Sequence, residues 1–253
     1  MTQFACQTIT WGRERLLGDY AGIVKEVAQI GYQGVESNLT ALGKARAILG
    51  DLSAETGIQF IAAHCGVQDA QAALAEANLW QDLHSTLQAA RVKFLLLSQV
   101  ALEDVQEYRA VGRLLIDLQQ RLGDLHVRVL YHNHQHEIDH RWQALRELCA
   151  VAGPDDLGLA VDFGWVMRGG VDPQELVDDL GPYIRYAHLK DFRNGDFTEL
   201  GAGDIGLEKA IPAIRGLNLP WWIAEQDQTT IGPRESATAN LAFLTAHRPP
   251  AAE

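Results

Sequence analysis

The sequence predicts a single α/β domain in which eight parallel strands close into a barrel and a helix follows each strand. Short apolar segments alternate with longer segments of helical period, and this alternation repeats eight times. A chain of 253 residues is the expected size for one (β/α)8, or TIM, barrel. The strand candidates are nearly continuous in apolar residues, which is typical of parallel strands covered on both faces. An open doubly wound sheet is the alternative, but no glycine-rich phosphate turn follows the first strand.

The predicted elements follow one another in strict alternation. The strands are expected at 4–10, 34–37, 58–64, 92–98, 127–133, 157–163, 184–190 and 220–226. The helices are expected at roughly 16–30, 39–55, 68–89, 102–123, 140–152, 172–181, 206–216 and 234–246. No linker or change of composition divides them, so we expect one domain over residues 1–253, with 246–253 as a loose C-terminal tail.

Local signals support several of these boundaries. Gly31 is an expected helix stop, and Asp172 followed by Pro173 is an expected N-cap with proline at the first helical position. An apolar stripe at spacings of three and four indicates that the helix over 39–55 faces the sheet. Its members are Leu42, Ala45, Ile48, Leu49 and Leu52.

Composition narrows the class of protein. The formal net charge of −12 opposes binding to nucleic acid or to an anionic membrane surface, although it does not exclude an anionic substrate. Three cysteines without CxxC spacing argue against a disulfide framework or a thiolate zinc site. The N-terminus has no signal-peptide pattern, and no apolar run approaches the roughly 18 residues that a membrane span requires. We therefore expect a soluble cytoplasmic protein.

Polar side chains gather at the ends of the predicted strands, where the active sites of such barrels lie. The stretch LYHNHQHE, residues 130–137, places three histidines and a glutamate at the end of the fifth strand. Taken singly, each such residue has an ordinary structural explanation, such as a hydrogen-bonded loop histidine or a carboxylate that caps a helix. The candidates, strand by strand, are Trp11, Glu36, His64, Ser98, Gln99, His132, Asn133, His134, Glu137, Asp162, His188, Lys190, Asp191, Glu225 and Asp227.

Together these residues favour a metal site. Several buried carboxylates and imidazoles around one barrel mouth would cost several kcal/mol for each unpaired charge, and a bound cation lowers that cost. Three carboxylates and one imidazole from four strands form an oxygen-rich site for a divalent cation. The predicted set is Glu137, Asp162, His188 and Glu225.

Five motifs resemble those of a known family. YHNHQHE, VDFGWVMRGGVDP, AHLKDF, GAGDIG and IAEQD are similar, in this order, to motifs of the xylose-isomerase-like sugar phosphate isomerase and epimerase barrels. The resemblance spans about residues 5–245. The YHNH form is similar to the branch that holds inosose dehydratases and epimerases of keto-sugars and keto-acids, including epimerases of bacterial 2-ketogluconate utilisation.

The resemblance implies a divalent metal (Mn, Mg, Co or Zn) held by Glu, Asp, His and Glu from the fifth to the eighth strands. Asp162, His188 and Glu225 match that pattern. Many family members place a glutamate at the end of the fifth strand, where this chain has His132. Glu137, in the loop that follows, is the preferred fifth-strand ligand, and His132 is the alternative. Members of the family often pair through barrel faces, so a homo-oligomer is also expected.

The expected reaction is epimerisation or isomerisation of a keto-sugar or sugar acid. A metal that chelates the carbonyl oxygen and a neighbouring oxygen stabilises the enediolate formed when the adjacent carbon loses its proton. Glu137 and Glu225, from non-adjacent strands, are expected to flank the substrate as catalytic acid and base. His134 or His64 could deliver the proton instead.

Substrate contacts are expected from four further residues. Trp11 is either an apolar wall for the sugar or an ordinary core tryptophan. His64 and His132 are expected to line the pocket. Lys190 is expected either to bind a substrate oxygen or carboxylate, or to pair with Asp191 or another acid at the barrel mouth.

Three alternative functions remain. A dehydratase of a keto-polyol would use a histidine to protonate a leaving hydroxyl. A metal-dependent nuclease on this barrel would need more histidines and a basic face, and the net charge of −12 argues against it. A barrel that only binds a ligand is disfavoured because the four-residue set is intact.

Overall fold

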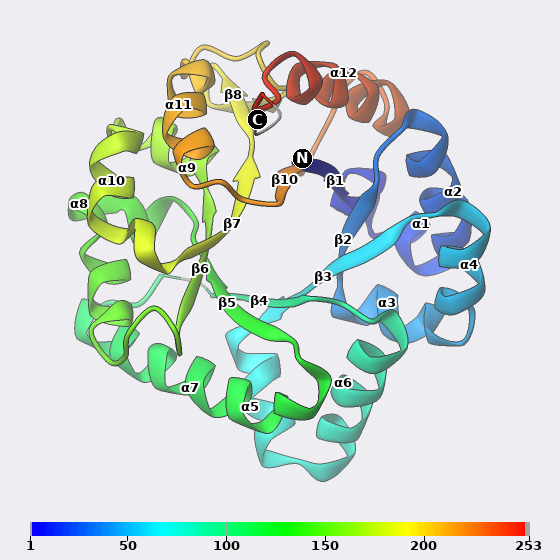
Figure 1. Ribbon diagram of the computed structural model, residues 1–253, viewed down its shortest axis with the longest axis horizontal. Coiled ribbons are helices and arrows are strands. Elements are labelled where there is room, and N and C mark those ends of the chain that lie inside the picture. The colour runs from blue at the N-terminus through cyan, green and yellow to red at the C-terminus, as the bar shows by residue number, and fades with distance from the viewer. Residues whose placement is uncertain (1, 100, 251–253) are drawn as a thin grey trace.

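The computed structural model describes residues 2–99 and 101–250, and its eight parallel strands close into a barrel with the helices outside (Figure 1). The strand order around the barrel is β1, β10, β7, β6, β5, β4, β3 and β2, and β2 pairs in turn with β1. The predicted fold class is confirmed, and each predicted strand overlaps an observed one. The barrel strands are β1 (Gln3–Gln7), β2 (Gly34–Asn38), β3 (Gln59–Gly66), β4 (Phe94–Ser98), β5 (Arg128–His132), β6 (Gly158–Asp162), β7 (Ile184–Leu189) and β10 (Trp221–Ala224).

The helices cover the outside of the barrel, and several predicted helices are divided into two. The segment 16–30 breaks at Asp19, whose extended backbone lets its carboxylate accept a hydrogen bond from the Gly22 N–H and begin a new helix. The α-helices are α1 (Gly12–Gly18), α2 (Tyr20–Ile30), α3 (Leu39–Ala45), α4 (Leu49–Thr56), α5 (Val67–Ala75), α6 (Ala77–Ala90), α7 (Tyr108–Arg121), α8 (Gln135–Cys149), α9 (Phe163–Arg168), α10 (Pro173–Leu180), α11 (Ile211–Gly216) and α12 (Pro233–Ala246). Short 3-10 turns span Thr8–Trp11, Arg46–Ile48, Val105–Glu107, Gly123–Leu125, Gly181–Tyr183 and Leu207–Ala210.

The predicted caps are confirmed, but one helix begins earlier than its sequence pattern indicates. Gly31 ends α2 with a positive φ of 110°, and Asp172 caps α10 with Pro173 in the first turn. Helix α8 begins at Gln135, not at residue 140, because Glu137 accepts a hydrogen bond from the His134 N–H at the start of the helix. The backbone of Asp139–Trp142 is non-helical, so a short first segment is separated by a kink from the longer segment that ends at Cys149.

The interior of the barrel near the strand N-termini is apolar and filled. Large rings of Tyr186 and Trp221 plug this half. Gly34 makes room for them, because a Cβ there would lie 2.9 Å from the ring of Trp221. The other members of this inner cluster are Ala5, Ile61, Ala62, Leu96, Leu130, Ala160 and Ile223, with Phe94 packed against it.

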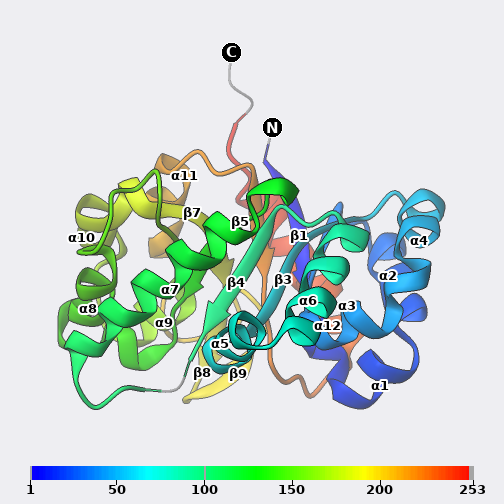
Figure 2. The same cartoon turned by 90° about the horizontal axis from the view of Figure 1, so that it is seen from below.

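A small antiparallel hairpin stands at the opposite end of the barrel. Strands β8 (Asp191–Arg193) and β9 (Asp196–Thr198) pair with each other after β7, at the end where α5 begins (Figure 2). Asp191 secures the loop behind the hairpin, because its Oδ2 accepts hydrogen bonds from the Gly201 and Gly203 N–H groups at 2.9 and 3.1 Å. This carboxylate therefore holds the glycine-rich GAGDIG segment in place.

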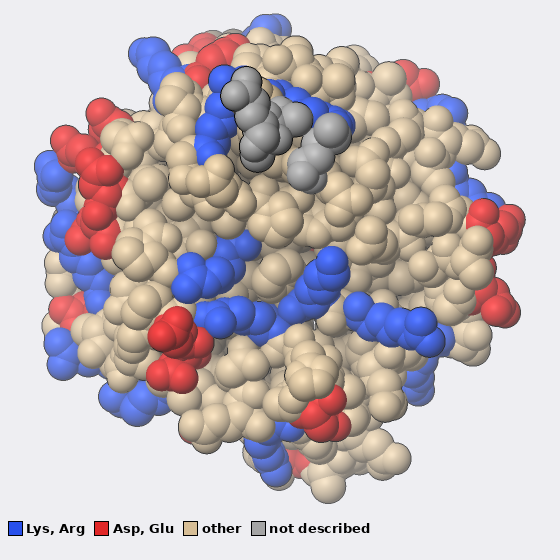
Figure 3. Space-filling view, viewed as in Figure 1, with Lys and Arg blue, Asp and Glu red and all other residues tan. Residues whose placement is uncertain are grey.

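The two ends of the barrel differ in charge. Lys and Arg side chains form a band across the middle of the face at which β1 begins (Figure 3). Arg128 and Arg185 lie at the N-terminal ends of β5 and β7, and both donate to the Pro154 carbonyl, at 2.6 and 2.8 Å. The acidic residues described below lie at the other end. No described helix is long and apolar enough to cross a membrane.

Candidate metal and catalytic site

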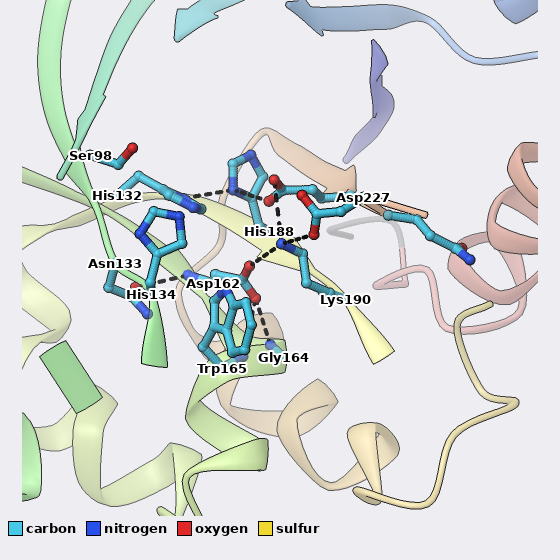
Figure 4. A network of polar contacts seen from close by, with 12 residues as sticks. Ser98, His132, Asn133, His134, Asp162, Gly164, Trp165, His188, Lys190 and Asp227 are labelled. Atoms are coloured by element: carbon cyan, nitrogen blue, oxygen red, sulfur yellow. Dashed lines mark hydrogen bonds and ion pairs between the residues drawn. The ribbon is translucent and has the colours of Figure 1, made fainter. Parts of the chain in front are cut away.

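Four potential ligands converge at the C-terminal end of the barrel. His132 and Asp162 are the last residues of β5 and β6, His188 lies near the end of β7, and Glu225 directly follows β10. One ligand atom of each residue lies within 4.8 Å of the others. All four side chains are buried, and Figure 4 shows His132 joined to His188, with Asp162 and Asp227 at the amine of Lys190. We call this set the four-residue cluster.

His188 is held from both sides of its ring. Its Nε2 lies 2.7 Å from the Oε2 of Glu36, a fully buried carboxylate on β2. Its Nδ1 lies 3.0 Å from the Oε2 of Glu225 and 2.9 Å from the Nδ1 of His132. If Nε2 carries the proton and donates it to Glu36, the lone pair of Nδ1 points into the cluster, where a cation would bind.

The two carboxylate oxygens of Asp162 have different roles: Oδ1 caps a helix and Oδ2 lies in the four-residue cluster. Its Oδ1 accepts hydrogen bonds from the Gly164 and Trp165 N–H groups at 2.8 and 3.3 Å, which caps α9. Its own N–H donates to the Asn133 Oδ1 at 3.0 Å, so the end of β6 is anchored to the end of β5. The Oδ2 is buried and accepts no hydrogen bond from the described residues; it lies 3.3 Å from the Lys190 Nζ and is the oxygen that could bind a cation.

Lys190 is the one ammonium group that the described residues bring to this network, and it is shared among three acids. Its Nζ lies 2.8 Å from Asp227, 3.3 Å from Asp162 and 3.4 Å from Glu225. Lys190 thus pairs with acids at the barrel mouth, one of the two roles expected from the sequence, and its partners are Asp162, Glu225 and Asp227 instead of Asp191. With Glu36 included, four carboxylates face one ammonium, which leaves a net charge of −3 when the imidazoles are neutral. A divalent cation fits that surplus.

The pKa values in the cluster reflect this negative surplus. Burial alone would lower the pKa of His188, but Glu36 and Glu225 raise it to about 9. Burial and the neighbouring His188 hold the pKa of His132 well below its usual range, so that ring is neutral.

The two carboxylates of the cluster shift in opposite directions. Burial raises the pKa of Asp162 to about 6, against the opposing effect of Lys190. Burial also opposes ionisation of Glu225, yet Lys190 and His188 lower its pKa to about 2. Glu225 is therefore the carboxylate that stays ionised over the whole working range of pH.

Glu137 lies outside the four-residue cluster, contrary to the preferred ligand set from the sequence. It is buried, and its oxygens accept hydrogen bonds from the hydroxyls of Tyr108 and Tyr131 and from the His134 N–H. Its position in the first turn of α8 directs it toward these tyrosines. Because strand side chains alternate, His132 points into the barrel instead. The geometry favours the alternative fifth-strand ligand, His132.

Two further histidines flank the cluster. The ring of His64 lies 5.2 Å from that of His132, and its Nε2 is 2.9 Å from the Ser98 Oγ. The ring of His134 lies 5.0 Å from that of His132, is half-buried, and has its pKa lowered by burial. With His136 and Glu137, His134 forms a second group that could hold a metal, but the hydrogen bonds to Glu137 already use both of its oxygens.

Trp11 is removed from these residues. Its indole Nε1 donates to Glu26 on α2 at 3.1 Å, and the side chain is 5% exposed. The described contacts therefore match the core-tryptophan alternative and not a wall of the substrate pocket. Conversely, the sequence places Glu36 and Asp227 at strand ends without indicating a role, and the structure brings them to His188 and Lys190. For Glu36 the sequence carries a signal, because residues 34 and 36 share one face of the strand and Glu36 is its one charged residue.

Comparison with known proteins agrees with this architecture. The profile of the xylose isomerase-like TIM barrel family matches residues 24–247. An inosose dehydratase of Clostridium botulinum is 25% identical over 161 residues, which cover 55% of this chain and 54% of that protein. An inosose dehydratase of Lacticaseibacillus casei is 27% identical over 153 residues, covering 50% and 51%. The chain thus spans about half the length of these curated relatives.

Solved structures share the fold at low sequence identity. A sugar phosphate isomerase/epimerase from Parabacteroides distasonis superimposes with a TM-score of 0.79 at 14% identity, covering 97% of this chain and 94% of that one. D-allulose 3-epimerase from Methylomonas sp., in complex with D-allulose, superimposes with a TM-score of 0.79 at 14% sequence identity, and 97% of both chains is covered. The IOLI protein with a bound zinc atom superimposes with a TM-score of 0.75 at 14% sequence identity, covering 97% of this chain and 98% of that one.

Proposed function

The chain belongs to the xylose isomerase-like TIM barrel family, and we propose that it is a divalent-metal-dependent epimerase or isomerase of a keto-sugar or sugar acid. The observation that carries the proposal is the convergence of His132, Asp162, His188 and Glu225 within 4.8 Å of one another. Two imidazoles and two carboxylates suit Mn²⁺, Co²⁺ or Zn²⁺ better than Mg²⁺, which prefers oxygen ligands and retains water.

The chemistry follows from what each residue can do. When bound, the cation supplies a Lewis acid for the substrate carbonyl, which makes the proton on the neighbouring carbon easier to remove. Glu36 keeps the His188 ring oriented, and Lys190 offsets the charge of the acids and can donate to a substrate oxygen. Glu225, ionised at neutral pH, can accept a proton from one side of the substrate.

Inversion of a stereocentre requires a second proton carrier on the opposite side. Glu137 is unsuited to that role because two tyrosine hydroxyls and a backbone N–H occupy its oxygens. His134 is the better candidate, since it is half-buried beside His132 and neutral. A neutral imidazole can accept a proton and return it, which suits a two-base epimerase.

A dehydratase is the second candidate, and it is favoured by the inosose dehydratases matched over half of the chain. The first half of both reactions is the same removal of a proton next to a carbonyl. A dehydratase would then lose a β-hydroxyl, which His134 or His64 could protonate. The observable difference lies in the product, because dehydration yields a conjugated enone.

The proposal is tested by proton NMR in deuterated water, with the metal-loaded protein and a panel of keto-sugars and keto-acids. Incorporation of solvent deuterium at one carbon next to the carbonyl is expected, and it should be lost in Asp162→Asn. Absorbance of a conjugated enone would identify the dehydratase. If no substrate of the panel exchanged a carbon-bound proton with folded, metal-loaded protein, the barrel would be assigned to ligand binding instead.

A further inference from the structure

A cavity of about 460 Å³ opens beside the four-residue cluster, at the ends of β2, β3 and β4. Its walls come from α3, α5 and α6, and its volume falls in the range of small-molecule sites. Neither the family match nor the proposed reaction assigns an occupant to it. The lining residues are Asn38, Leu39, Thr40, His64, Cys65, Gly66, Asp69, Ala72, Ala73, Leu79, Asp82, Leu83 and Ser98.

The cavity adjoins the candidate site, and His64 lies between them. His64 and Ser98 form its inner wall and are hydrogen-bonded to each other at 2.9 Å. On its other side, His64 packs 5.2 Å from the ring of His132 and lies 3.7 Å from Glu36. A molecule whose carbonyl lies at the four-residue cluster can therefore extend past His64 into the cavity.

The lining combines an apolar wall with uncharged polar groups. Leu39, Leu79 and Leu83 supply aliphatic surface, and Leu79 is 39% exposed, unusually open for a leucine. Thr40 and Ser98 supply hydroxyl groups, and the side-chain amide of Asn38 lies at the same rim. Such a surface suits a polyhydroxylated chain, whose C–H faces pack on aliphatic groups while its hydroxyls exchange hydrogen bonds.

The charges of the lining oppose an anion. The cavity carries two carboxylates, Asp69 and Asp82, and no Lys or Arg among its lining residues. The nearby Arg46 is already engaged, since it donates to Asp82 at 2.8 Å and to Ser85 at 2.7 Å. The lining side chains therefore offer no cationic partner to a phosphate ester, which carries about −1.5 to −2 charge near pH 7.

We propose that this cavity binds the uncharged polyhydroxyl end of the substrate, and that the enzyme therefore acts on an unphosphorylated keto-sugar and discriminates against its phosphate ester. The inference rests on the proposed function for the position of the carbonyl. A sugar acid remains compatible when its carboxylate lies at the cation and only its hydroxyl-bearing end enters the cavity.

The test measures binding and turnover separately. Binding of D-fructose, D-tagatose and D-allulose, and of their 6-phosphate esters, is measured by calorimetry on the Mn²⁺-loaded protein. We expect each ester to bind about tenfold or more weakly than its parent sugar, because its negative charge would lie beside the carboxylates of Asp69 and Asp82. Ala72→Phe, which fills the cavity, should weaken the best sugar by a similar factor.

A charge variant and its control sharpen the test. Leu79→Lys places a cation in the lining, so the ratio of the ester's dissociation constant to that of the sugar should fall several-fold. Ile48→Lys makes the same change of charge at an exposed apolar residue that does not line the cavity, and it should leave this ratio unchanged. Esters that bind as well as or better than sugars, no effect of Ala72→Phe, or no sugar binding at all would overturn the proposal.

The two proposals fail in different ways. If deuterium exchange occurs but prefers the esters, the reaction stands and the cavity assignment is wrong. If the sugars bind with the expected discrimination and no proton exchanges, the cavity assignment stands and the reaction is wrong.

Discussion

The two halves of the barrel interior differ in chemistry although the same strands build both. Near the strand N-termini the interior is apolar and closed by Tyr186 and Trp221. His188 lies two residues after Tyr186 on β7, and Glu225 lies four residues after Trp221. Leu130 and His132 on β5, and Ala160 and Asp162 on β6, repeat the same step of two. Side chains on a strand point into the barrel at every second residue, so the inward positions of one strand pass from the apolar half to the polar half within a few residues.

This comparison shows how one scaffold serves two needs. Among the described side chains of the apolar half, polar atoms are limited to the Tyr186 hydroxyl and the Trp221 indole nitrogen, and the packing of this half stabilises the barrel. The polar half gathers three carboxylates around the Lys190 ammonium and a fourth, Glu36, against His188, and it depends on a proton or a cation for its balance of charge. Changes in the first half should therefore alter stability, and changes in the second should alter metal binding.

The largest expected effect lies in the apolar half. Trp221→Ala removes a ring that is 2% exposed and should lower the free energy of unfolding by about 3–5 kcal/mol. Denaturant titration measures this loss, and metal titration of the folded variant should give the wild-type stoichiometry. A loss below about 1 kcal/mol would show that the barrel does not depend on this plug.

The next effect lies in the polar half. Asp162→Asn keeps an acceptor for the α9 cap but removes a ligand charge, so metal affinity should fall by about 100-fold or more, beyond the loss typical of outer-sphere changes. Affinity is measured by competition with a chelating dye. Asp172→Asn, the same change at the exposed cap of α10, is the matched control and should retain wild-type affinity. Equal affinities in the two variants would refute the assignment of Asp162.

A smaller effect is expected at the residue that orients His188. Glu36→Gln removes the charge that faces His188 Nε2 at 2.7 Å and should weaken metal binding by about 10–100-fold. Glu26→Gln, which changes a carboxylate paired with Trp11 and Arg15 away from the cluster, should have no such effect. Because affinity is read directly, an unchanged value would show that Glu36 does not position the histidine, whatever happens to turnover.

The pH dependence of metal affinity should be the most gradual effect. A metal ligand must be neutral imidazole, and in the metal-free protein the pKa of His188 is raised to about 9. Each cation bound below that pH displaces a proton, so affinity should rise about tenfold per pH unit and level off near pH 9. A rise that ended near 6.5, the ordinary pKa of histidine, would contradict the raised value.

Stability of the metal-free protein should change in the opposite sense. A folded-state pKa raised above the unfolded value of about 6.5 contributes stability that is fully present below that pH and is lost as the pH rises through about 9. Added Mn²⁺ should therefore raise the melting temperature more at pH 8 than at pH 6. Thermal melts with and without Mn²⁺ at both pH values measure the difference.

The amino-acid sequence by itself determined the barrel, the eight strands and three members of the cluster. Apolar runs and helical periods are local patterns, and their eightfold alternation leaves few ways to bury all the apolar faces. Asp162, His188 and Glu225 could be placed because each closes or follows an apolar strand, and parallel strands in a barrel end at one rim. The resemblance to the family is confirmed by the match over residues 24–247.

The tertiary structure alone decided which fifth-strand residue joins that cluster and which groups surround it. His132 and Glu137 are five positions apart, and only the early start of α8 shows that one points inward while the other turns to Tyr108 and Tyr131. The Glu36 contact joins residues 152 positions apart. No local pattern encodes such a contact, because it depends on how the strands are arranged around the closed barrel. The same closure sets the partners of Lys190 and the cavity between α3, α5 and α6.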